Sequence, residues 1–158
     1  MGELEHVEIQ VCRKGHLLNE SAAWDPHSNQ KFCPSCGSEG IVVCPNCGSR
    51  ITSADTNPYR AVVIPAYCCE CSKPFPWTET AIQAAVEFGD ELDALNSQDK
   101  ADLKAAVPDL VSDTARTPLA ISRVQKLFAK IGKPAAQTLL QILVSVLTEE
   151  AKKQLGLQ

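Results

Sequence analysis

The chain lacks long apolar runs, a secretory leader and an excess of positive charge, and each absence excludes a class of protein. No apolar run approaches the ~20 residues that a membrane-spanning helix needs. Residues 1–11 are acidic and have no apolar core, so they are not a secretory signal and we expect a cytoplasmic location. The formal net charge is −4, which argues against a protein whose main surface binds nucleic acid.

Motifs that mark common enzymes are absent as well. The sequence contains neither His-Glu-x-x-His nor a glycine-rich phosphate loop. His6-Val7-Glu8 matches part of the zinc-deaminase signature, but no Pro-Cys-x-x-Cys follows it. A catalytic zinc also keeps an open coordination position, which the ligand count described next does not leave. We therefore expect that the protein is not an enzyme.

Cysteine is abundant by contrast, and its spacing indicates metal rather than disulfides. Seven of the eight cysteines and one histidine form four two-ligand clusters within residues 12–71. Four thiolate or imidazole ligands complete a closed tetrahedral site, so eight ligands predict two structural zinc ions per chain. A rubredoxin-like iron site and redox-active dithiols are the alternatives. The predicted ligands are Cys12, His16, Cys33, Cys36, Cys44, Cys47, Cys68 and Cys71.

Two of these ligands are chosen by spacing. His16 completes the first cluster, which has a single cysteine, and His6 and His27 are the alternatives. In the last cluster Cys68 is preferred over its neighbour Cys69, because only the former keeps two residues before the final cysteine.

The four clusters can be paired in two ways. Sequential pairing joins the first cluster to the second and the third to the fourth, whereas the cross-brace of RING-type fingers joins alternate clusters. RING-type fingers have Cys-x-His as their second pair, and the third pair follows after two or three residues. Here the second pair is CxxC, and seven residues separate Cys36 from Cys44. We therefore favour sequential zinc ribbons.

The composition changes near Trp77, which divides the chain into two predicted domains. Residues 1–77 contain all cysteines and histidines, whereas residues 78–158 are rich in alanine and leucine. Short β-branched runs at residues 7–11, 41–43 and 61–64 predict strands that lead into the cysteine turns. We predict an α+β chain, in which a double zinc-ribbon module (1–77) precedes a helical bundle (78–158). Trp24 is expected to cover a metal site.

Helical periodicity predicts four helices, over about residues 80–96, 97–107, 117–132 and 134–155. The prolines at residues 74–77 disfavour helix before Thr78, and Pro108 is expected to end the second helix. In the last helix, apolar residues between Leu139 and Leu147 cover more of the circumference than one packed face uses. We therefore expect a protein partner or a homo-oligomer to cover the C-terminal helices.

The third predicted helix carries a basic face. Arg123, Lys126, Lys130 and Lys133 recur every three or four residues, and Arg116 precedes them. Such a face can contact phosphate, but more often it is solvated and balances acidic helices nearby. We prefer the second interpretation, and nucleic-acid binding through residues 116–133 is the alternative function.

Several motifs together resemble a known family. They are Cys-x-x-Gly-His near the N-terminus, Lys-Phe-Cys-Pro-Ser-Cys-Gly at residues 31–37, a second Cys-Pro-x-Cys-Gly, and a last CxxC followed by Pro-Phe-Pro-Trp-Thr. Over about residues 7–80 the chain resembles a bacterial family of zinc-ribbon proteins of unknown function. It departs at Ser72, where a glycine often follows such a knuckle. The resemblance implies a bacterial origin, zinc and no assigned activity.

Taken with the ligand count, these observations favour a non-catalytic zinc-binding scaffold or protein-interaction module.

Overall fold

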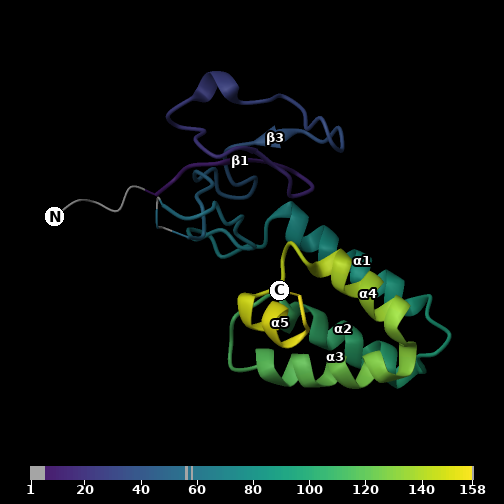
Figure 1. The fold of residues 1–158 in the computed structure, drawn as a ribbon. Coiled ribbons are helices and arrows are strands. Elements are labelled where there is room, and N and C mark those ends of the chain that lie inside the picture. Colours follow the sequence, from purple (N-terminus) through teal and green to yellow (C-terminus); the bar gives the residue numbers. More distant parts are fainter. Residues whose placement is uncertain (1–5, 56, 58, 158) are drawn as a thin grey trace. The chain divides into compact units, whose positions relative to one another are not determined.

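The computed structural model describes residues 6–55, 57 and 59–157 (Figure 1). The chain divides into two compact units, Met1–Glu79 and Thr80–Gln158. Within the described residues the strands lie in the first unit and most helical residues in the second. The predicted α+β class is confirmed. The division falls two residues after the boundary predicted between residues 77 and 78.

A small antiparallel sheet organises the first unit. Strands β1 (Gln10–Cys12), β2 (Leu17–Asn19) and β3 (Gly40–Ile41) lie in the order β2-β1-β3. Ile9 and Val11 are fully buried, but Gln10 between them is buried as well, where its side chain donates to the Gln30 carbonyl and accepts from the Gln30 N–H. Cys12 at the end of β1 lies opposite Gly40 of β3. Because β3 follows the second cysteine cluster, the sheet brings the first two clusters close together.

The strand predicted at residues 61–64 is not formed. Residues 61–64 have no regular secondary structure, although Val63 accepts a hydrogen bond from the Ala54 N–H (2.8 Å) and donates one to the Ser53 hydroxyl (3.0 Å). These two bonds do not continue into a ladder, and Val63 is 44% exposed. A β-branched composition favours a strand, but a strand also needs a neighbour along its length.

The helices of the chain are α1 (Pro76–Asp90), α2 (Ser97–Leu110), α3 (Thr117–Ile131), α4 (Lys133–Leu143) and α5 (Glu149–Gln154), with a short 3-10 turn η1 (Pro26–Ser28). Two prolines depart from expectation. Pro76 begins α1, because a proline at the first helical position lacks only an N–H that would have no helical partner. Pro108 lies inside α2 near its end, where the helix continues because Val107 and Leu110 are fully buried.

The last predicted helix is two helices, α4 and α5, rather than one. Thr148 starts α5: its hydroxyl accepts a hydrogen bond from the Ala151 N–H at 3.1 Å, and its own N–H donates to the Leu110 carbonyl. Val146 and Leu147, in the turn between the helices, are buried. The turn directs these side chains into the unit, so the wide apolar arc expected of a single helix does not form.

Helix α3 is the centre of the second unit, because it packs against α2, α4 and α5. The largest fully buried side chains of this unit are Leu103, Val107, Leu110, Ile121, Val124, Leu139 and Leu143. They form a core that contains no cysteine. Among the described residues, no helix combines the length and the hydropathy that crossing a bilayer requires.

Candidate metal centres

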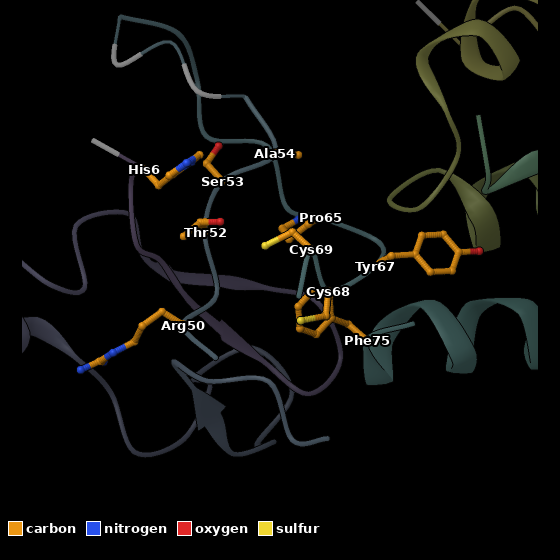
Figure 2. A pocket seen from close by; sticks show the side chains of 10 residues that line it. All are labelled: His6, Arg50, Thr52, Ser53, Ala54, Pro65, Tyr67, Cys68, Cys69 and Phe75. Atoms are coloured by element: carbon orange, nitrogen blue, oxygen red, sulfur yellow. The ribbon is translucent and has the colours of Figure 1, made fainter. Parts of the chain in front are cut away.

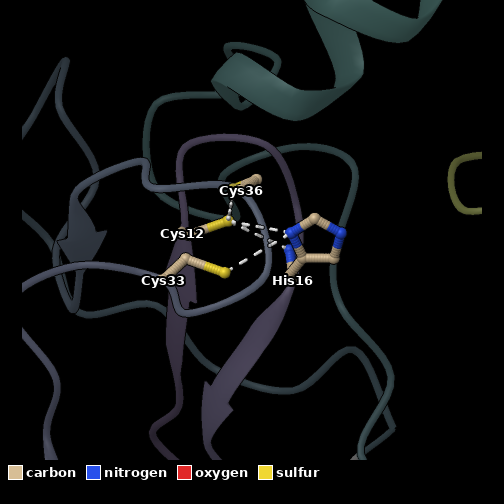
Figure 3. A group of neighbouring side chains, drawn as sticks. All are labelled: Cys12, His16, Cys33 and Cys36. Atoms are coloured by element: carbon tan, nitrogen blue, oxygen red, sulfur yellow. Dashed lines mark hydrogen bonds between the residues drawn. The ribbon is translucent and has the colours of Figure 1, made fainter.

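The first candidate centre consists of Cys12, His16, Cys33 and Cys36, whose ligand atoms lie within 4.8 Å of one another (Figure 3). Cys12 ends β1 and His16 directly precedes β2, so one hairpin supplies two ligands. The imidazole turns its Nδ1 toward the sulfurs. This nitrogen lies 3.5 Å from the Cys12 Sγ and 3.6 Å from the Cys33 Sγ. The donor set is therefore three thiols and one imidazole.

The second candidate centre consists of Cys44, Cys47, Cys68 and Cys71, which also lie within 4.8 Å of one another. The Sγ atoms of Cys44 and Cys71 are 3.8 Å apart, and those of Cys47 and Cys68 are 3.7 Å apart. The first cluster thus meets the second and the third meets the fourth. This is the sequential arrangement, and within the described residues the clusters form no cross-brace.

These distances suit a tetrahedral metal ion and exclude disulfides. A tetrahedron with metal–sulfur bonds of about 2.3 Å has sulfur–sulfur edges of about 3.8 Å. The Sγ atoms of Cys12 and Cys36 are 3.6 Å apart, whereas a disulfide brings two sulfurs to about 2.05 Å. All eight cysteines are free thiols. Each group therefore offers four soft donors around a space of metal-ion size.

The ligand pairs sit on tight turns with a common hydrogen-bond pattern. In the second turn the Gly37 N–H donates to the Cys33 carbonyl, and the Cys33 N–H donates to the Ser38 carbonyl, both at 2.8 Å. Equivalent bonds occur in the third and fourth turns, and the first turn, which ends in histidine, has a similar pair. These local bonds explain why spacing along the sequence is enough to predict which side chains gather in each group.

Positive backbone φ angles complete the turns. Gly15, Gly37 and Gly48 have φ of 92°, 72° and 78°, values that glycine adopts without strain. In the fourth turn Ser72 has φ of 59°, a conformation that costs a residue with a side chain about 1–2 kcal/mol. The turn that lacks the usual glycine therefore forms the same geometry at a conformational cost.

Burial and hydrogen bonding divide the ligand thiols into two kinds. Burial raises the pKa of the Cys12 thiol, and it raises the pKa of Cys68 to about 11. The Ser38 hydroxyl lowers the pKa of Cys36 to about 6, and the Ser49 hydroxyl, 3.2 Å from the sulfur, lowers the pKa of Cys47 to about 6. A metal needs thiolates, so thiols with a raised pKa, such as Cys12 and Cys68, must release protons on binding. Metal uptake should accordingly weaken as the pH falls.

Two stacked aromatic side chains pack near the turn that carries Cys12 and His16. Phe75 and Trp77 are both 3% exposed and stack with ring centroids 4.6 Å apart. The Trp77 indole N–H donates to the Pro65 carbonyl at 2.9 Å. A Cβ at Gly15 would lie 3.0 Å from the Trp77 Cβ, a tight contact that a larger residue could make only if the indole shifted. The knuckle and the stacked rings are therefore packed together.

The remaining thiol and histidines lie outside both groups. Cys69 is exposed, and its sulfur is 4.0 Å from the Glu70 carboxylate. His6 and His27, the alternatives to His16, belong to neither group. Trp24 does not cover a metal site as expected, since 77% of its surface is exposed.

A cavity of about 240 Å³ lies beside the second centre (Figure 2). Cys68 and Cys69 border it together with His6, Arg50 and Thr52. Sequence reasoning did not anticipate this cavity, because its lining comes from segments far apart in the chain. It contains no further group of metal-binding side chains among the described residues.

Comparisons with known proteins place the chain in a family without assigning it a role. The family described as "Uncharacterized protein conserved in bacteria (DUF2321)" matches residues 5–155. No curated protein and no solved structure matches the chain. The match extends well beyond the cysteine motifs and includes the helical unit. The chain therefore belongs to this uncharacterised family of conserved bacterial proteins.

Proposed function

We propose that the protein is a non-catalytic zinc-binding scaffold that acts through contacts with other proteins. The observation that carries this proposal is the closure of both centres. Each brings four protein ligands to tetrahedral spacing, so a bound ion keeps no position for a substrate. The metal is then a structural element of the first unit, whose small sheet offers little apolar surface for folding without it.

Zinc is the metal that this donor chemistry favours. Thiolate and imidazole are soft or borderline donors, and sites with four thiolates or three thiolates and one imidazole are typical structural zinc sites. The sulfur–sulfur distances of 3.6, 3.8 and 3.7 Å match the edges of a zinc tetrahedron. Iron is the competing metal for the four-cysteine centre, and the experiment below distinguishes them.

The cavity beside the second centre gives little support to catalysis. It contains an exposed thiol, Cys69, and an imidazole, His6. An activated nucleophile needs its base within hydrogen-bond reach. Within the described residues no hydrogen bond joins these two groups, and the contact of the thiol is with the Glu70 carboxylate.

Nucleic-acid binding through α3 is the alternative function, and ion pairs within the second unit weaken it. Arg116 pairs with Asp109 at 3.0 Å, and Lys130 pairs with Asp99 at 2.5 Å. The other three cations of the basic face have no ion pair among the described residues, namely Arg123, Lys126 and Lys133. Three unpaired positive charges on an acidic protein favour the interpretation that the basic face is solvated, rather than that it binds phosphate.

Purified protein should contain two zinc ions per chain, one for each group of ligands. Elemental analysis of protein made without added metal tests this, with free-thiol titration before and after chelation. Before chelation the exposed Cys69 should react quickly and the ligand cysteines slowly. A ratio near one, or a red iron chromophore, would contradict the assignment.

The protein should not bind DNA or RNA in a salt-sensitive way. Fluorescence anisotropy with labelled single- and double-stranded oligonucleotides at low salt measures this. Micromolar binding that weakens with added salt and is lost in Lys126→Glu would favour the alternative function. Lys14→Glu, in the first unit, is the matched control because it changes the net charge equally away from α3.

A further inference from the structure

The segment after β2 holds a tryptophan in solvent by an ordered network of hydrogen bonds. The Asn19 side-chain amide accepts from the Ser21 N–H and donates to the Asp25 carbonyl, both at 2.9 Å. The Trp24 N–H donates to the Ser21 carbonyl at 3.0 Å. Ala22 between them is buried, and its N–H donates to the Glu8 carbonyl. The backbone around Trp24 is therefore fixed, although the side chain is 77% exposed.

The indole borders a cavity of about 260 Å³, which we call the Trp24 groove. Val7 and Val62 contribute apolar lining, and Glu20, Asp55 and Arg60 contribute charge. Arg60 pairs with Asp55 at 3.7 Å. Glu20 has no ion pair among the described residues. The groove thus has an excess of one negative charge beside a large aromatic face.

This chemistry suits a cation. The face of an indole attracts an ammonium or guanidinium group, and a nearby carboxylate adds a charge-assisted hydrogen bond. Another exposed ring of the first unit already has a cation over it, since the Lys31 Nζ lies 5.8 Å from the Phe32 ring centroid. No cation of the described residues lies over Trp24. Phosphate would meet the carboxylates of Glu20 and Asp55, which disfavours nucleic acid at this position.

We propose that the Trp24 groove binds an arginine or lysine side chain of a partner protein. The proposal rests on the proposed function as a scaffold and names where and by what chemistry a partner docks. An exposed, pre-ordered tryptophan is the kind of residue that concentrates binding energy in protein interfaces. The negative charge of the groove complements a basic segment of the partner. The whole chain is acidic too, so it would repel an acidic partner.

Tryptophan indole signals in a ¹⁵N–¹H NMR spectrum provide a direct test, because the chain has two tryptophans. Trp24 is exposed, whereas Trp77 is buried with its N–H bonded to Pro65, so the second signal is an internal control. Trp24→Phe assigns the two signals. The probes are the peptide acetyl-Gly-Gly-Arg-Gly-Gly-amide and the same peptide with neutral citrulline in place of arginine.

We expect the arginine peptide to shift the Trp24 signal saturably and to leave the Trp77 signal in place, while the citrulline peptide shifts neither. Glu20→Gln should weaken the peptide by about threefold or more, since it removes the unpaired carboxylate. Glu79→Gln makes the same charge change in the first unit outside the groove and should change the affinity little.

Equal shifts with both peptides, or equal effects of the two glutamine variants, would overturn the proposal. So would a Trp24 signal that moves with protein concentration alone, which would indicate a second copy of the chain, or one that moves only with single-stranded DNA. Metal analysis of the same samples separates this result from the proposed function: two zinc ions with no peptide binding would reject the groove and leave the zinc scaffold standing.

Discussion

Replacing Cys44 by serine is expected to release about one metal ion per chain and to unfold the first unit. Cys44 is 3% exposed and its sulfur lies 3.8 Å from that of Cys71, so the variant leaves three ligands in a closed site. Structural zinc binding contributes about 10–16 kcal/mol in small zinc domains, as much as the whole stability of a typical domain. Elemental analysis and the dispersion of backbone NMR signals measure the two effects.

Cys69→Ser is the matched control, because it makes the same chemical change at the neighbouring turn. Cys69 is exposed and lies outside both ligand groups. Its replacement should leave the metal content unchanged and alter the unfolding free energy by about 0.5 kcal/mol or less. If Cys69→Ser releases zinc while Cys68→Ser does not, the ligand in this turn is the other cysteine.

The turns that hold the ligands could be predicted from sequence because everything that shapes them is local. The hydrogen bonds from Gly37 to Cys33 and from Gly48 to Cys44 span four residues, and the glycines supply the positive φ within the same motif. Ser72 adopts this conformation without being glycine, which shows that closure of the turn dominates the preference of a single residue.

The pairing of the turns depended on contacts that no local motif encodes. In the first centre the sheet holds the two clusters together, because Val11 faces Ile41 and Cys12 faces Gly40. The salt bridge from Arg13 to Glu39, at 3.0 Å, connects the same two turns. Spacing arguments favoured this arrangement over the cross-brace, and in the first centre strand pairing supports it.

Two predictions from the sequence were wrong at positions where hydrogen bonds fix the conformation. Nothing in residues 144–147 is a helix breaker by composition, yet the chain turns there, and the bond from the Thr148 N–H to the Leu110 carbonyl joins the turn to α2. Trp24 was expected to cover a metal site, whereas its side chain is 77% exposed and the hydrogen bonds of Asn19 order the backbone beside it. Both errors concern positions where a distant or side-chain hydrogen bond overrides residue type.

Replacing Leu143 by aspartate is expected to unfold the second unit and leave the metal content at two ions per chain. Leu143 is 1% exposed at the end of α4, next to the turn that carries the buried Val146 and Leu147. Removing a buried leucine side chain costs about 2–5 kcal/mol, and an unpaired buried carboxylate adds to it. The sum approaches the total stability of a domain of this size. The metal ligands all belong to the other unit.

Circular dichroism at 222 nm, elemental analysis and light scattering together separate the possible outcomes. Val144→Asp is the control, because this neighbouring residue is 43% exposed and should lose about 0.5 kcal/mol or less. Lost helicity with both metal ions retained is the expected result for Leu143→Asp, and it would identify the leucines of residues 139–147 as an internal core. A smaller species that stays helical would instead mean that Leu143 lies between copies of the chain, which its burial within a single chain contradicts.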